Sequence, residues 1–175
     1  MIKTIDLKEY IRDIPDFPKQ GIIFKDISTL LKNSEAFRES IDLLAAKFKN
    51  EKIDQVVGVE ARGFIFGAPL AYKLGAGFVP VRKKGKLPYK TKSVTYQLEY
   101  GTDTLEIHED AVGAGSRVLV VDDLLATGGT VKAVAELLKA QKADIVGIAF
   151  VVELGFLKGK SKLKDFPVYS VIQYD

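Results

Sequence analysis

Apolar residues recur along the chain in short runs that are rich in Val and Ile and lack strict alternation. Such runs are typical of strands buried on both faces of a parallel sheet. Between most of them, the apolar positions follow the helical spacing of three and four residues. The runs predict strands over 55–59, 78–82, 118–122, 145–152 and 168–172, and the spacing predicts helices over 5–11, 35–48, 63–74 and 130–139. This alternation of strands and helices predicts an α/β fold with a mainly parallel central sheet flanked by helices.

One segment between the second and third predicted strands departs from this pattern. Residues 93–100 alternate apolar and polar side chains, residues 101–103 can turn the chain, and residues 105–108 can return as a second strand. Alternation of this kind predicts a β-hairpin with one covered face. Because long excursions from a sheet often cover an active site, we expect this hairpin to project as a mobile lid.

The segment 118–130 carries the clearest chemical signal. An apolar run ends in two acids, Asp122 and Asp123, and a glycine pair flanked by threonines then opens a predicted helix. Glycines let main-chain N–H groups approach an anion at the positive end of the helix dipole, so the loop predicts a phosphate site. Carboxylates repel phosphate and need other partners, which sugar hydroxyls or a Mg²⁺ ion held partly through water would provide.

This segment could also be a strand-turn-helix unit without a ligand, or one of the two commonest phosphate loops. No G-x-x-x-x-G-K-[ST] motif is present, and the glycines of 113–115 precede a predicted strand instead of following one. Neither nucleoside triphosphate hydrolysis nor dinucleotide binding is therefore indicated. The combination of acids, glycines and threonines favours a sugar phosphate over a turn without function.

Composition is that of a compact domain. The chain has 175 residues, 47% of them hydrophobic, and no linker-like segment divides it, so we expect one domain over residues 1–175. It has no cysteine, which excludes a Cys nucleophile. It has one histidine, His108, so we expect no metal site built from several histidines. His108 is expected at the surface. The N-terminus lacks a signal-like pattern and no apolar segment reaches about 18 residues, so we expect a cytoplasmic protein that does not enter membranes.

The motif over 122–130 resembles the binding motif of the phosphoribosyltransferase family for 5-phosphoribosyl 1-pyrophosphate (PRPP). Four further segments, 17–28, 60–64, 82–88 and 98–101, recur in this order in the branch of that family that uses adenine. The resemblance spans almost the whole chain. It implies the type I phosphoribosyltransferase fold, with the hairpin as a lid and a short N-terminal hood. It also implies a Mg²⁺-dependent reaction of adenine with PRPP to give AMP and pyrophosphate, and a homodimer.

The resemblance assigns the residues that would hold the phosphoribosyl group. Residues of the loop would bind the 5-phosphate through main-chain N–H groups and hydroxyls: Ala126, Thr127, Gly128, Gly129 and Thr130. Asp122 and Asp123 would hold the ribose hydroxyls, with Mg²⁺ nearby and bound mainly through ligand and water. Below the ring, they would also favour the positive charge of a carbocation-like ribose.

A local positive charge suits the leaving pyrophosphate. The net charge is only +3, but six basic residues and no acid lie within 82–92. A short cluster without interleaved aromatic residues is weak support for nucleic acid, and we expect none as a partner. Residues assigned to pyrophosphate are Glu60, Ala61, Arg62, Arg82, Lys83 and Lys86. The resemblance also implies a cis peptide bond at Glu60–Ala61.

The remaining residues are assigned to binding of adenine and to removal of its proton. By resemblance, backbone groups along Ile23, Phe24 and Lys25 would read the base, with Phe24 and Leu124 as apolar walls. Lys25 stands where the family frequently has arginine. Glu99, in the lid, would accept a proton from the purine. The alternatives are a transferase for another base and a regulatory protein that keeps the PRPP site without turnover.

Overall fold

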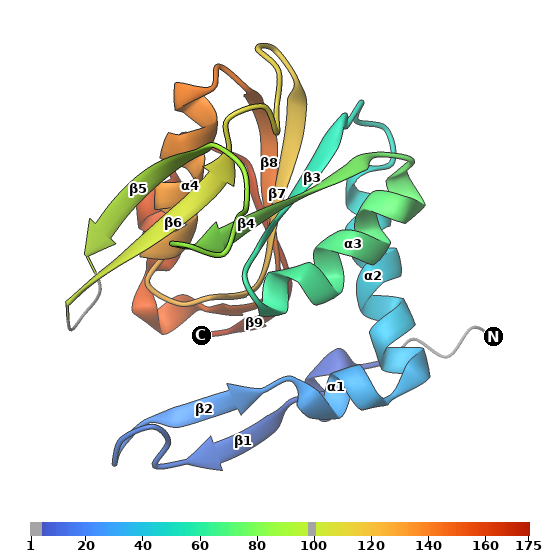
Figure 1. Ribbon diagram of the computed structural model, residues 1–175. Helices are drawn as coiled ribbons and strands as arrows, with labels where there is room; N and C mark the ends of the chain where they lie inside the picture. Colours follow the sequence, from blue (N-terminus) through green and yellow to red (C-terminus); the bar gives the residue numbers. More distant parts are fainter. Residues whose placement is uncertain (1–4, 98–100) are drawn as a thin grey trace. The chain divides into compact units, whose positions relative to one another are not determined.

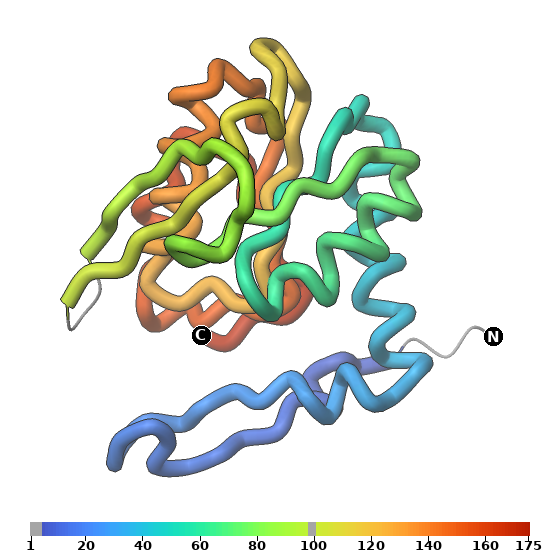
Figure 2. Tube along the Cα trace, in the orientation of Figure 1, coloured from blue at the N-terminus to red at the C-terminus, as the bar shows by residue number. Residues whose placement is uncertain are grey.

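The computed structural model describes residues 5–97 and 101–175. Backbone contacts group the chain into two compact units, Met1–Leu43 and Leu44–Asp175, and each is described by itself. The trace in Figure 2 follows the chain through both units. The expectation of one domain over residues 1–175 stays a prediction.

The N-terminal unit is built on a β-hairpin. Its elements are η1 (Leu7–Tyr10), β1 (Arg12–Pro15), β2 (Ile23–Asp26), α1 (Ser28–Lys32) and the start of α2 (Ser34–Phe48). The helix expected over 5–11 is wrong, because one 3₁₀ turn is followed at once by the extended residue Ile11. The chain enters strand β1 directly after Ile11, and β1 pairs with β2, which leaves no room for a longer helix. The helix expected over 35–48 is confirmed as α2, and Asn33 Oδ1 accepts from two N–H groups of its first turn.

The hairpin of the N-terminal unit is fixed by ion pairs across its strands. Arg12 pairs with Asp26, and Lys25 Nζ lies 2.6 Å from Asp13 Oδ1. The Asp26 carboxylate also accepts from Ser28 N at 2.9 Å, and this bond and the Arg12 guanidinium lower the pKa of Asp26 to about 2. The connection between the strands contains a cis peptide bond at Phe17–Pro18.

The C-terminal unit is a seven-stranded sheet in the order β5-β6-β4-β3-β7-β8-β9 (Figure 1). Its strands are β3 (Gln55–Val59), β4 (Gly77–Lys83), β5 (Thr91–Gln97), β6 (Thr102–His108), β7 (Arg117–Leu125), β8 (Asp144–Leu154) and β9 (Val168–Tyr174). β4, β3, β7, β8 and β9 run parallel, and β6, which pairs with β5 in the hairpin, is antiparallel to β4. All five strands predicted from the apolar runs are confirmed.

Two helices cover opposite faces of this sheet. α3 (Arg62–Leu74) connects β3 to β4, and α4 (Gly129–Ala140) connects β7 to β8. The two connections lead in opposite directions along the sheet, and right-handed crossovers then place their helices on opposite faces, as Figure 1 shows. Two short 3₁₀ helices, η2 (Gly155–Leu157) and η3 (Gly159–Leu163), precede β9.

The centre of the sheet is buried and apolar. The four residues of β7 before its acids, Val118 to Val121, are 0% exposed, as are Val56 and Val57 of β3. A strand flanked by parallel neighbours and covered on both faces has no exposed side, which explains its lack of alternation. The fold therefore brings the carboxyl ends of β3, β4 and β7 to one edge, where α/β sheets bind ligands.

The projecting hairpin is confirmed for its two strands, with two corrections. Thr102 and Asp103, expected in the turn, belong to β6, because the strand pairing continues to Gln97 and Thr102. His108, expected at the surface, is half-buried: its Nε2 is enclosed without a hydrogen-bond partner among the described residues, and its ring meets that of Tyr89 edge-on at 6.0 Å. The tip, residues 98–100, lies outside the described residues.

Candidate active site

The two acids lie at the carboxyl end of the central strand β7. Asp123 is 3% exposed and Asp122 is half-buried, and Asp123 N donates to Asp122 Oδ1 at 2.9 Å. Burial and the neighbouring Asp123 carboxylate raise the pKa of Asp122 well above its ordinary value. Burial also raises the pKa of Asp123, against the opposing effect of Arg62. Two carboxyl groups in this setting favour partners that carry positive charge or donate hydrogen bonds.

Arg62, the first residue of α3, approaches the acids from the next strand connection. Its Nε lies 3.0 Å from Asp123 Oδ2, which is buried and has no aligned hydrogen-bond donor among the described residues. Gly63 makes this approach possible, because a Cβ there would lie 2.9 Å from the carbonyl oxygen of Val121. The start of α3 is therefore packed directly against the end of β7.

The predicted phosphate loop connects β7 to α4. Gly128 adopts φ 76° and caps the helix, and Gly129 and Thr130 form its first turn. The first intrahelical bond runs from Lys132 N to Gly128 O, so the N–H groups before Lys132 have no acceptor within the helix. A cavity opens over the loop and is lined by residues 122 and 124–131. All five residues assigned to the 5-phosphate thus surround one hollow with free donor capacity at a helix N-terminus.

A glycine far along the sequence supports this loop. A Cβ on Gly159, the first residue of η3, would lie 2.2 Å from Ala126 O and 3.0 Å from Gly128 N. The converse also holds, because a Cβ on Gly128 would lie 2.5 Å from Gly159 O. The two backbones are in direct contact and leave no room for a side chain at either position. Nothing in the local sequence of Gly159 signals this role.

The lid hairpin contacts the same loop from another side. β5 packs along α4, and Thr130 Oγ1 donates to the Tyr96 hydroxyl at 3.4 Å. In the sequence, Tyr96 stands out only as one of the alternating apolar positions of the hairpin, without a link to the phosphate loop. Its position near the end of β5 shows that the hairpin contacts the loop that would hold the 5-phosphate.

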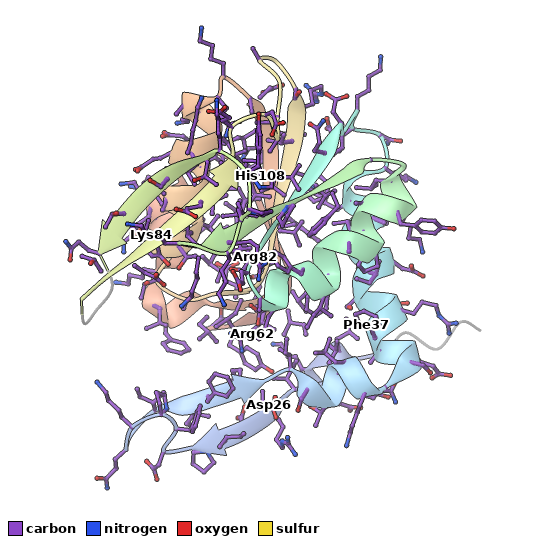
Figure 3. The ribbon with its side chains drawn as sticks, viewed as in Figure 1. Asp26, Phe37, Arg62, Arg82, Lys84 and His108 are labelled. Carbon is purple, nitrogen blue, oxygen red and sulfur yellow. The ribbon has the colours of Figure 1, made fainter. Side chains whose placement is uncertain are left out.

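The predicted pyrophosphate residues converge at the ends of β3 and β4. The peptide bond of Glu60–Ala61 is cis, as expected. Glu60 accepts from Arg82 Nε at 3.2 Å, from Arg82 Nη2 at 3.1 Å and from Lys83 N at 2.9 Å. The Arg82 hydrogen bonds are the largest effect that lowers the pKa of Glu60. Figure 3 labels Arg62 and Arg82, which reach this region from α3 and β4.

Two acids that the sequence did not single out also belong to this region. Lys83 Nζ lies 3.2 Å from Asp103 Oδ2, and Asp103 raises the pKa of Lys83. Glu106, 8% exposed, accepts from Gly85 N at 2.9 Å. The one signal for Glu106 in the sequence is a carboxylate between two apolar residues, Leu105 and Ile107, which are both buried in β6.

The residues assigned to adenine fall in both units. Ile23, Phe24 and Lys25 form three of the four residues of β2, where Ile23 is 55% exposed and the Phe24 ring meets Phe17 edge-on at 5.2 Å. Leu124 lies near the end of β7 and lines the phosphate cavity. Glu99, assigned as proton acceptor, lies outside the described residues.

Metal-binding clusters and membrane-spanning helices are both absent from the described part of the chain. Over residues 5–97 and 101–175, no group of three or more His, Cys, Asp or Glu side chains is arranged to hold a metal ion. Within these same ranges, none of the helices is both long enough and apolar enough to cross a membrane.

Comparison with known proteins shows which family the chain belongs to. The sequence profile of the phosphoribosyl transferase domain matches residues 26–175. The chain belongs to the phosphoribosyltransferase family. Among phosphoribosyltransferases, it is 63% identical over 169 residues to the adenine phosphoribosyltransferase of Syntrophotalea carbinolica, with 97% of this chain and 99% of that protein covered.

Solved structures of phosphoribosyltransferases have the same fold as this chain. The adenine phosphoribosyltransferase of Thermoanaerobacter pseudethanolicus superposes with a TM-score of 0.93 at 55% identity, over 96% of this chain and 98% of that one. The Saccharomyces cerevisiae enzyme, solved with adenine and an imino-altritol bisphosphate, gives a TM-score of 0.89 at 46% identity, over 94% of this chain and 96% of that one. The type I phosphoribosyltransferase fold expected from the sequence is thus confirmed.

Proposed function

We propose that this chain transfers the phosphoribosyl group of PRPP to adenine and releases AMP and pyrophosphate, a reaction of purine salvage. The observation that carries the proposal is the strand-to-helix segment from Asp122 to Thr130, which presents one half-buried and one buried acid beside a helix N-terminus. Relatives at 55–63% identity that carry the same activity in their names support the choice of adenine. In the reaction, a nitrogen of the base displaces pyrophosphate from C1 of the ribose.

The phosphate loop would bind the 5-phosphate of PRPP. The main-chain N–H groups of the first turn of α4 offer donors along the helix dipole, and the Thr127 and Thr130 hydroxyls add two more. Because this phosphate does not change during the reaction, its binding would fix the ribose in position. The same subsite would hold the phosphate of AMP.

Asp122 and Asp123 would bind the ribose hydroxyls and act on the reacting carbon electrostatically. As pyrophosphate departs, positive charge builds on the ribose ring, and carboxylates fixed beneath it lower the energy of that charge. Arg62, whose Nε lies 3.0 Å from Asp123 Oδ2, would instead direct its positive charge toward the leaving pyrophosphate. The hydroxyls of the ribose would donate to Asp122 and to Asp123, whose Oδ2 is met among the described residues by the Arg62 ion pair.

Mg²⁺ is the cofactor that this site fits. The neighbouring carboxylates of Asp122 and Asp123 offer the oxygen ligands that Mg²⁺ prefers. Asp122 and Asp123 would hold the ion mainly through water and through oxygens of the ligand. When bound, the ion offsets negative charge on the leaving pyrophosphate.

The pyrophosphate would bind at the ends of β3 and β4. Lys83 and Lys86 carry positive charge there, and Arg82 is fixed beside them. Ala61 would contribute its main-chain N–H, whereas the Glu60 N–H donates to Val81 O at 2.9 Å. This assignment accounts for the basic cluster without nucleic acid. Positive charge at this place stabilises the leaving group, which gains charge as its bond to C1 breaks.

Adenine recognition and proton removal complete the proposed site. Backbone donors and acceptors along Ile23, Phe24 and Lys25 match the amino group and ring nitrogen of adenine, whose directions are reversed in 6-oxo purines. Leu124 would cover one face of the base. Glu99 would accept the purine proton when the lid closes. By family resemblance, we also propose a cytoplasmic homodimer, which size-exclusion chromatography with light scattering would test.

An initial-rate assay tests the proposed function. Purified protein is given PRPP, Mg²⁺ and, in turn, adenine, hypoxanthine, guanine, xanthine or orotate. We expect turnover with adenine and a kcat/KM at least about 100-fold lower with each other base, because the reversed donor leaves polar groups unpaired. A preference for another base would identify a different transferase. Binding of PRPP without turnover on any base would favour a regulatory protein.

A further inference from the structure

Residues 82–86, here called the basic turn, carry four basic side chains, while the main-chain N–H groups of residues 83–86 are all engaged. Lys83 N donates to Glu60 Oε2 at 2.9 Å, and Gly85 N donates to Glu106 Oε2 at 2.9 Å. Lys84 N donates to Thr104 O at 3.1 Å, and Lys86 N donates to Lys83 O at 3.2 Å. An anion at this turn must therefore be bound by side chains, and their positions depend on how the backbone is fixed.

Two carboxylates fix that backbone from opposite sides. Glu60 reaches it from the end of β3, and Glu106 reaches it from β6, whose residues pair with the end of β4. Gly85, the residue held by Glu106, has φ 79°, a conformation that only glycine adopts readily. Glu106 is 8% exposed and Glu60 is half-buried, so both hydrogen bonds are partly shielded from water.

The guanidinium group of Arg82 also makes its contacts within the protein. Its Nε and Nη2 form a two-pronged contact with Glu60, and its Nη1 donates to Lys86 O at 3.3 Å. Three of its nitrogens are thus engaged within the protein. Lys84 and Lys86, by contrast, present exposed side chains from the same turn (Figure 3 labels Lys84).

We propose that Glu60 and Glu106 are positioning residues for pyrophosphate, and that Arg82 acts on pyrophosphate mainly by holding Glu60 and the carbonyl of Lys86. The two acids set the backbone of the basic turn so that its lysine side chains face a common anion. This inference rests on the proposed function, because it assigns pyrophosphate to the basic turn.

The direction of the effect separates positioning from simple electrostatics. A carboxylate near an anion repels it, so removing its charge tightens pyrophosphate binding if charge alone matters. If the carboxylate positions the turn, its removal weakens binding instead. Glu106→Leu and Glu106→Gln remove the same charge, but the Gln side chain keeps an oxygen that can accept from Gly85 N. The two variants therefore differ in the hydrogen bond and agree in the charge.

The experiment measures the reverse reaction of AMP with pyrophosphate in the holoenzyme with Mg²⁺. We expect Glu106→Leu and Glu60→Leu to raise the KM for pyrophosphate roughly 10-fold, and Glu106→Gln to stay within about 3-fold of wild type, as expected for loss or retention of the hydrogen bond to the backbone. The KM for AMP, which lacks pyrophosphate, is expected to change less than about 2-fold. The matched control is Glu109→Gln, an exposed glutamate that follows β6.

Several outcomes would overturn the inference. Equal or tighter pyrophosphate binding in Glu106→Leu and Glu60→Leu would show that the acids act by charge alone, and parallel increases in the KM for AMP and pyrophosphate would show a general structural defect. The two acids are changed in separate proteins, so a folding failure of one, seen by circular dichroism, leaves the other to decide. An inactive wild-type protein would instead refute the proposed function, which this design distinguishes from the failure of the inference.

Discussion

Replacing Gly159 by Ala perturbs the phosphate loop from a residue that is not itself assigned to the substrate. The added Cβ would lie 2.2 Å from Ala126 O and 3.0 Å from Gly128 N. Carbon and oxygen atoms without a bond between them stay apart by about 3.2 Å or more, so the Ala126 carbonyl or η3 must move by about 1 Å. Gly128, with φ 76°, connects that carbonyl to the helix start, so the displacement is transmitted to the loop amides.

The size of the effect follows from that displacement. A misplacement of about 1 Å in a positioning group can lower a rate about 100-fold, which corresponds to roughly 2.7 kcal/mol. We therefore expect Gly159→Ala to lower kcat/KM for PRPP by roughly 10- to 100-fold. AMP binding should weaken as well, because AMP carries the same 5-phosphate. The KM for pyrophosphate, which has no 5-phosphate, should stay near that of wild type.

The assay compares forward rates with PRPP and reverse rates with AMP and pyrophosphate. Gly77→Ala is the matched control, because a Cβ at that position in β4 has its nearest neighbours at 3.6 Å, an ordinary contact distance. Thermal unfolding reports any loss of stability in either variant. Wild-type kcat/KM for PRPP in a folded Gly159→Ala protein would refute the reasoning, since it would show that the loop tolerates the shift.

Four further predictions address other parts of the molecule. Replacing Asp122 and Asp123 together by Asn should lower kcat about 30- to 1,000-fold, for a loss of about 2 to 4 kcal/mol of transition-state stabilisation, with little change in the unfolding temperature; wild-type turnover would contradict the role of the acids. Lys25→Ala should weaken adenine binding modestly and keep adenine preferred over hypoxanthine in competition assays, because backbone groups remain; a reversed preference would assign specificity to the side chain. Glu99→Gln should lower the single-turnover rate roughly 10²- to 10⁴-fold while PRPP affinity is retained, and an unchanged rate would assign proton removal to another group. Asp26, whose pKa of about 2 in the folded protein lies below its ordinary 3.8, should stabilise the N-terminal unit above about pH 4 and lose this contribution as the pH falls toward 2, so Asp26→Asn should flatten the dependence of unfolding temperature on pH in that range.

The parallel sheet was predictable because a strand that is buried on both faces appears in the sequence as a continuous apolar run. The apolar run that ends at Asp122 predicts a central strand. The structure places β7 at the centre of the sheet, fully buried over Val118 to Val121. The short strands β1 and β2 were not predicted. Their four-residue lengths and their polar residues give no clear period, and what stabilises them is ion pairing across the hairpin, such as that of Arg12 with Asp26.

In the candidate site too, residues that are adjacent in the sequence could be identified, and residues that act from a distant part of the chain could not. The loop around Gly128 was identified from adjacent residues, because glycines, threonines and acids in one segment record its chemistry directly. Gly159 and Glu106 act on ligand-binding segments that lie far from them along the chain, and no spacing rule connects them to those segments. Their contribution became visible only as backbone contact and hydrogen bonding in the folded protein.

The two strands of the lid hairpin each touch one of the two proposed phosphate-binding segments. One of its strands meets the 5-phosphate loop through Tyr96 and Thr130, and the other meets the basic turn through Asp103 and Glu106. Under the proposed assignment, the 5-phosphate lies next to the first strand and the pyrophosphate next to the second. PRPP would therefore reach both strands of the hairpin at once, whereas pyrophosphate alone would reach one.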